Sequence, residues 1–201
     1  MKKLILASKS PRRRQLLANL GVLFDIIPSR AVEAEVTVND PGQLVETLAL
    51  RKAEAVASSM PDREERLVIG ADTIVVLDGT ILGKPKNDQE AAAMLRRLSG
   101  NWHQVFTGVA VFATKSGSFD SAHEQTAVKI RSLSGKEIAA YVATGEPLDK
   151  AGAYGIQAKG ALLVERIDGC YFNVVGLPLV KLAELLARYG VDLLTLGEEK
   201  P

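Results

Sequence analysis

The segment SKSPRRR at residues 8–14 gathers two hydroxyl groups and four cationic side chains in seven residues. It follows a short apolar run, and Ser10 and Pro11 are typical of an N-cap and a first helical residue. A helix N-terminus presents unpaired N–H groups and a partial positive charge, so anions bind there. Three arginines oppose that dipole, and a bound polyanion would balance them. The segment predicts a phosphate site; the alternative is a capped surface helix with solvated arginines.

Asp72 interrupts an almost wholly apolar run at residues 67–77. Burying an unpaired carboxylate costs several kcal/mol. We therefore expect Asp72 to lie at a strand end, to bind a metal or to pair with a cation. A carboxylate is a hard oxygen ligand suited to Mg²⁺, and it can also activate water. A purely structural ion pair is the alternative.

Two further segments carry groups that could contact a phosphorylated ligand. Lys84 lies twelve residues after Asp72, beyond an Asp78-Gly79 turn. If that turn forms a hairpin, Lys84 returns to the same end of the sheet, where it can neutralise phosphate charge. The stretch GEPLDKAGAYGIQ at residues 145–157 combines glycines with charged, amide and aromatic groups, which is typical of a ligand loop. It matches neither G-x-G-x-x-G nor a P-loop, and a plain irregular connection is the alternative.

Glu33 and Lys52 are weaker candidates, because glutamate and lysine mostly lie at the surface. His103 and Cys170 lie in apolar strand patterns without an evident catalytic partner, so we expect both to be structural. A single cysteine can form neither an internal disulfide nor a thiolate metal site.

The alternation of helical and strand patterns predicts an α/β fold. Strands are expected at residues 4–7, 24–27, 67–77, 103–113 and 122–132, and helices at 11–20, 41–58, 88–100, 135–145 and 179–189. The 103–132 hairpin makes the sheet mixed. Residues 146–160 are irregular, and residues 161–167 and 171–175 are expected to form a hairpin around Asp168-Gly169.

The composition limits the class of protein. The chain has 201 residues, of which 47% are hydrophobic and 24% charged, so it can bury a core and is not disordered. A net charge of +1 and 5% aromatic residues disfavour a nucleic-acid-binding protein. No run approaches the ~20 apolar residues of a membrane span, and the N-terminus is a poor signal peptide. We therefore expect no nucleic-acid or membrane partner and a cytoplasmic location.

Seven motifs, in order over nearly the whole chain, resemble the Maf family of nucleotide pyrophosphatases, also called septum formation inhibitors. They are LASKSPRRRQLL at 6–17, Glu33, residues 49–53 with Lys52, GADTIV at 70–75, LGKP at 82–85, GEPLDKAGAYGIQ at 145–157 and VVGLPL at 174–179. The resemblance implies one domain over residues 1–201. Its fold would be an elongated mixed central sheet with flanking helices and two lobes around a cleft, like inosine triphosphate pyrophosphatases.

The resemblance also implies an activity, the hydrolysis of a nucleoside triphosphate between its α and β phosphates with a divalent cation, Mg²⁺ or Mn²⁺. It assigns Asp72 as the catalytic proton acceptor. Specificity would come from Arg12, Thr73 and Gln157, and further pocket positions are Ser8, Arg13, Glu33, Lys52 and Lys84. We expect Glu33 to assist Asp72 in catalysis or in holding the metal.

The loop at residues 149–157 resembles the branch of the family that acts on dTTP and UTP. The Gln157 amide can offer a donor and an acceptor to the imide edge of uracil or thymine. Ala158 stands where relatives often have glycine. Two alternatives remain: a 7-methyl-GTP pyrophosphatase and a non-catalytic nucleotide-binding regulator of septum formation. Members of the family are often dimers, so we expect a homodimer.

Overall fold

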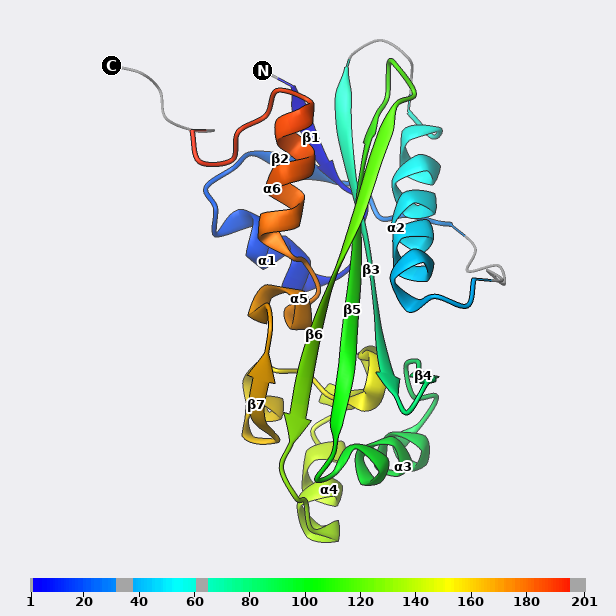
Figure 1. The fold of residues 1–201 in the computed structure, drawn as a ribbon, viewed down its shortest axis with the longest axis vertical. Coiled ribbons are helices and arrows are strands. Elements are labelled where there is room, and N and C mark those ends of the chain that lie inside the picture. Colours follow the sequence, from blue (N-terminus) through cyan, green and yellow to red (C-terminus); the bar gives the residue numbers. More distant parts are fainter. Residues whose placement is uncertain (1, 32–37, 61–64, 196–201) are drawn as a thin grey trace. The chain divides into compact units, whose positions relative to one another are not determined.

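The computed structural model describes residues 2–31, 38–60 and 65–195 (Figure 1). Its strands are β1 (Lys3–Leu6), β2 (Phe24–Ile26), β3 (Arg66–Leu77), β4 (Thr80–Leu82), β5 (Trp102–Ala113), β6 (Phe119–Ile130) and β7 (Val164–Asp168). Its α-helices are α1 (Pro11–Ala18), α2 (Pro41–Ala57), α3 (Asp88–Leu98), α4 (Gly135–Val142), α5 (Tyr171–Val175) and α6 (Leu179–Arg188). Three 3₁₀ helices follow α4: η1 (Glu146–Asp149), η2 (Ala151–Ala153) and η3 (Ala158–Leu162). Within the described ranges, no helix is both long and apolar enough to cross a membrane.

The described strands form one seven-stranded sheet in the order β2-β1-β3-β5-β6-β7, with β4 paired to β3. β1 runs parallel to both β2 and β3. The pairs β3–β4 and β6–β7 are antiparallel. The expected α/β class with a mixed sheet and flanking helices is therefore confirmed.

The chain divides into two compact units. Unit 1 comprises Met1–Asp72, Thr107–Glu124 and Gly176–Pro201, and unit 2 comprises Thr73–Phe106 and Gln125–Val175. The long strands β3, β5 and β6 contribute residues to both units. The arrangement of two lobes around a cleft stays a prediction.

In unit 1, helix α2 packs directly on the sheet. The helix begins at Asp40, whose carboxylate accepts a hydrogen bond from Gln43 N at 2.8 Å. A Cβ atom at Gly70 of β3 would collide with the backbone carbonyl of Ala49, and one at Gly108 of β5 would collide with that of Val45. Two glycines therefore let the α2 backbone lie against two strands, where larger side chains would hold it away.

In unit 2, helices α3 and α4 cover an apolar core. The largest buried side chains there include Leu95 and Leu98 of α3 and Ile130 of β6. Both helices begin at the residues that the sequence predicts, and a polar side chain caps each one. Asn87 accepts from Glu90 N at 2.9 Å, and Ser134 forms a reciprocal capping box with Glu137.

The hairpin predicted over residues 161–167 and 171–175 is wrong, and its first strand starts later than expected, at Val164. Residues 171–175 form helix α5 instead of the second strand of a hairpin, and β7 pairs with β6. Short apolar runs do not distinguish strands from buried helices. Here Asn173 decides the conformation, because its fully buried amide donates to Val105 O at 3.0 Å and to Thr126 Oγ1 at 2.8 Å. Helix α5 therefore follows from contacts with β5 and β6.

Candidate active site

The connection between β1 and α1 presents hydroxyl groups at the start of a helix. Ser8 is only 8% exposed, and its Oγ accepts a hydrogen bond from Ser10 N at 3.1 Å. Ser10 caps α1, accepting from Arg13 N at 3.4 Å. Pro11 occupies the first helical position, as the sequence predicts. Both hydroxyl groups therefore lie at a helix N-terminus, as the sequence predicts.

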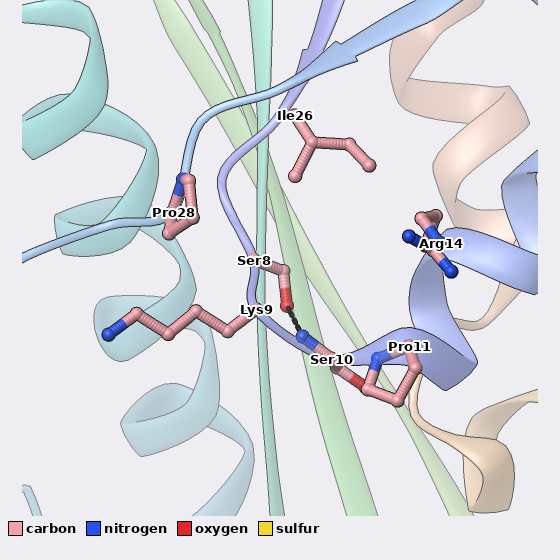
Figure 2. A pocket seen from close by; sticks show the side chains of 7 residues that line it. All are labelled: Ser8, Lys9, Ser10, Pro11, Arg14, Ile26 and Pro28. Atoms are coloured by element: carbon pink, nitrogen blue, oxygen red, sulfur yellow. Dashed lines mark hydrogen bonds between the residues drawn. The ribbon is translucent and has the colours of Figure 1, made fainter.

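A pocket of about 260 Å³ opens beside this helix start, lined by Ser8, Lys9, Ser10, Pro11, Arg14, Ile26 and Pro28. Figure 2 shows the two serines on the connection, with Lys9 on one side and Arg14 on the other. Hydroxyl groups, two cations and a helix N-terminus together suit an anion such as phosphate. Ile26 and Pro28 supply an apolar wall.

Arg13 connects the start of α1 to the last residues of β3 that belong to unit 1. Its Nε donates to Gly176 O at 2.7 Å and its Nη1 to Ala71 O at 2.8 Å. The same Nη1 lies 3.5 Å from Ser8 Oγ. Burial lowers the pKa of Arg13, and the negative charge of Asp72 opposes that shift. Arg13 therefore holds the backbone immediately before Asp72, and its predicted contact with phosphate stays a prediction.

Asp72 pairs with Lys52. Lys52 Nζ donates to Asp72 Oδ1, and the two side chains are only 19% and 14% exposed, respectively. Ala49, which touches Gly70, lies one helical turn before Lys52, so the close approach of α2 to β3 carries Lys52 to the carboxylate. The sequence left three arrangements open for Asp72: a strand end, a metal ligand or an ion pair. The structure shows the ion pair.

The residues around Asp72 could hold a metal ion only together with oxygen atoms supplied by a bound ligand. Among the described residues, no group of three or more His, Cys, Asp or Glu side chains is placed to hold a metal. Mg²⁺, however, binds through one or two carboxylates plus phosphate and water oxygens. Asp72 offers one carboxylate, whose Oδ1 accepts a hydrogen bond from Lys52. Glu33, the second predicted carboxylate, lies outside the described residues.

Three predicted residues belong to unit 2. Thr73 is partly exposed in β3, and Lys84 and Gln157 are exposed. The β3–β4 pairing, with Val75 opposite Leu82, turns the chain back toward Thr73 and confirms the hairpin expected at Asp78-Gly79. Gly152 N donates to Gly83 O at 3.0 Å, which ties the loop at residues 145–157 to the segment that carries Lys84.

The predicted residues thus fall into two groups. Ser8, Arg13, Lys52 and Asp72 are linked by described contacts in unit 1, and Arg12 lies partly exposed on the first turn of α1. Thr73, Lys84 and Gln157 lie in unit 2. Sequence reasoning missed the contribution of Gly70, although a glycine inside an apolar strand signals a close backbone approach.

The fold and these contacts describe an α/β protein in which one guanidinium connects a helix start suited to anions with the backbone next to an ion-paired carboxylate. The chain matches the family model for Maf-like protein over residues 3–189 and belongs to this family.

Several curated relatives are similar over nearly their full length. One from Moorella thermoacetica, named dTTP/UTP pyrophosphatase, is 58% identical over 96% of this chain and 97% of its own. Relatives with the same name from Acetivibrio thermocellus and Pelotomaculum thermopropionicum are 52% and 50% identical, each over 96% of this chain, and over 98% and 100% of their own. Among solved structures, a nucleoside-triphosphatase, dITP/XTP pyrophosphatase, from Mycobacterium abscessus is similar with a TM-score of 0.40. It is 16% identical and covers 65% of this chain and 75% of its own.

Proposed function

We propose that the protein is a nucleoside triphosphate pyrophosphatase that hydrolyses dTTP and UTP to the nucleoside monophosphate and pyrophosphate. The observation that carries the proposal is the position of Arg13 Nη1, which lies within reach of both Ser8 Oγ and the carbonyl oxygen of Ala71. It links a helix start suited to phosphate with the backbone that presents Asp72. Relatives that are 50–58% identical and are named dTTP/UTP pyrophosphatase support the same activity.

In this proposal the helix start binds the phosphate chain. Ser8 and the N–H groups at the start of α1 donate to phosphate oxygens, and Arg12 and Arg13 offset their charge. Lys84 is proposed to add a further positive charge to the phosphate site. Ser8 is buried and the N–H groups are fixed by the helix, so both can stabilise the charge that develops on the phosphates without reorganising.

Asp72 is the proposed proton acceptor. It takes a proton from the water that attacks the α phosphorus, and the bond between that phosphorus and the pyrophosphate oxygen breaks. Lys52 holds the carboxylate through Oδ1, so one carboxylate orientation is favoured when the substrate binds. Both side chains are mostly buried, and their electrostatic contacts are therefore stronger than on an open surface.

We further propose that Asp72 and Glu33 hold a divalent cation, Mg²⁺ or Mn²⁺, together with the substrate. When bound, such an ion would neutralise phosphate charge and promote deprotonation of water. We assign base selection to Gln157, with Arg12 and Thr73. A site built on hydrogen bonds to the base rejects mismatched bases strongly, because its polar groups would stay unpaired.

The test is release of pyrophosphate from a panel of nucleoside triphosphates with Mg²⁺, with Mn²⁺ and with a chelator. Metal-dependent release confined to dTTP, UTP and close analogues is the expected result. Turnover mainly of 7-methyl-GTP would retain the chemistry and overturn the base assignment. Tight nucleotide binding without turnover of any nucleotide would favour the non-catalytic regulator.

A further inference from the structure

A buried polar pair, His103 and Tyr154, lies beneath the loop that carries Gln157. His103 belongs to β5 and Tyr154 directly follows η2, and both belong to unit 2. Their exposed fractions are 3% and 4%. His103 Nε2 lies 2.7 Å from Tyr154 Oη, and the two rings meet edge-on with centroids 5.2 Å apart. The pair therefore joins the loop to the sheet through a short, water-excluded hydrogen bond.

Both groups of the pair are uncharged near neutral pH. Burial lowers the pKa of His103 to about 4, and burial also raises the pKa of Tyr154. A neutral imidazole carries one N–H and a phenol carries one O–H, so one of these two hydrogens is donated across the pair. A neutral hydrogen bond in an apolar surrounding is stronger than one in water. The bond is thus suited to fix the position of the loop. Because both groups are excluded from solvent, they are not placed to act as catalysts.

The backbone next to Tyr154 is strained and needs such support. Ala153 has φ +60° and Ala158 has φ +53°, both in the left-handed region that favours glycine. This conformation is unfavourable for a residue with a Cβ atom and persists only where the surrounding structure holds it. Tyr154 immediately follows Ala153, so the hydrogen bond to His103 acts directly on the strained segment.

Other contacts hold the loop on both sides of Gln157. Tyr141 Oη accepts from Gly155 N at 3.2 Å, and the Glu146 carboxylate accepts from the N–H groups of Lys159 and Gly160, each at 3.3 Å. Gln157 itself is exposed. The loop therefore presents this side chain from an anchored backbone, and the His103–Tyr154 bond is the contact in which two buried side chains meet.

We propose that His103 and Tyr154 are a positioning pair for Gln157 and thereby set the selectivity for the base of the nucleotide. This inference rests on the proposed role of Gln157 in base recognition. Neither residue touches the substrate; each acts through the backbone of the loop.

The test compares the affinity of the full-length protein for α,β-methylene analogues of dTTP and dCTP. Tyr154→Phe removes only the hydroxyl group, and we expect it to lower the dTTP-to-dCTP affinity ratio about fivefold, the effect of one lost hydrogen bond. His103→Gln keeps an N–H donor and should retain more of the ratio than His103→Ala. Tyr189→Phe, in unit 1, is the matched control and should leave the ratio unchanged. Because both ligands meet the same folded fraction, a ratio does not change through lost stability alone.

A double variant separates positioning from an independent effect. If Tyr154 acts through Gln157, then Tyr154→Phe combined with Gln157→Ala should lower the ratio no further than Gln157→Ala alone. Additive losses, or an unchanged ratio in Tyr154→Phe, would overturn the inference and leave the proposed function standing. A wild-type protein that binds both analogues equally would overturn the proposed base selection and the inference with it.

Discussion

Lys52 of α2 donates a hydrogen bond to Asp72 of β3, and this contact brings together two side chains twenty residues apart in the chain. Gly70 makes the contact possible, because a side chain there would collide with the backbone of Ala49, one turn before Lys52. Gly70 and Asp72 therefore act together: Gly70 allows α2 to pack closely against β3, and Asp72 accepts the hydrogen bond from Lys52 of that helix.

Asp72→Asn should lower pyrophosphate release from dTTP about a thousandfold, because an amide cannot accept the proton from water. Nucleotide binding should survive, since the hydroxyls and arginines of the helix start are unchanged. Initial rates and calorimetric binding measure the two effects. Asp78→Asn is the matched control: Asp78 is exposed, and asparagine tolerates its φ of +47°. Near-normal turnover of Asp72→Asn would remove the assignment of Asp72 as proton acceptor.

Gly70→Ala should displace α2 from β3 and lower both stability and turnover. Overpacking of this kind costs about 1–3 kcal/mol, and here the obstacle is backbone, which cannot rotate away. Urea unfolding and the rate of dTTP hydrolysis measure the two effects. Gly135→Ala is the control, because a Cβ at Gly135 meets no atom within 4 Å. Equal stability of the two variants would contradict the close packing at Gly70.

Arg13→Lys should destabilise the protein by about 2–3 kcal/mol, even though it keeps the charge. The guanidinium reaches two carbonyl oxygens at once, those of Ala71 and Gly176, and a lysine cannot match both directions. Chemical denaturation measures the loss. Arg14→Lys, on the exposed side of the same helix, should change stability by less than about 0.5 kcal/mol. Similar losses in both variants would argue against a bridging role for Arg13.

The left-handed backbone at Ala158 predicts an unusual substitution pattern at an exposed position. Ala158→Gly should leave stability within about 1 kcal/mol, because the strain it removes is offset by a more flexible unfolded chain. Ala158→Val should cost about 2 kcal/mol, since a β-branched residue is disfavoured there. Ala140→Val, on an exposed face of α4, should cost only about 0.5 kcal/mol. Thermal unfolding compares the three, and equal costs for the two valines would contradict this conformation.

Acid should destabilise the protein partly through His103. Its pKa of about 4 in the folded protein lies below the ordinary value of 6.5, so the unfolded chain binds more protons between these values. Stability is therefore lost as the pH falls from 6.5 toward 4, by about 3 kcal/mol for this group. In His103→Gln, the drop in unfolding free energy between pH 7 and pH 4.5 should be about 2–3 kcal/mol smaller than in the wild type. Parallel pH profiles would mean that His103 is not buried as a neutral group.

Much of the fold was predictable because its signals are local. Helices α1 to α4 begin at the residues that the sequence predicts, because each start has a local cap, a side chain that bonds to an N–H three residues away. The caps are Ser10, Asp40, Asn87 and Ser134. The Asp78-Gly79 turn likewise connects β3 to β4 as expected. The failure at residues 171–175 has a different origin, because α5 depends on the buried bonds of Asn173 to β5 and β6.

The sequence by itself determined the chemistry that this protein can use: two serines and three arginines at a helix start, a carboxylate inside an apolar strand and a glutamine on an irregular loop. Only the tertiary structure decided the partners. It assigned Asp72 to Lys52, the Arg13 guanidinium to carbonyl groups at Ala71 and Gly176, and His103 to Tyr154. A side chain's type and its local helix or strand follow from a few neighbouring residues. Its contacts across 20 to 163 residues of chain depend on which backbones can approach closely, as at Gly70.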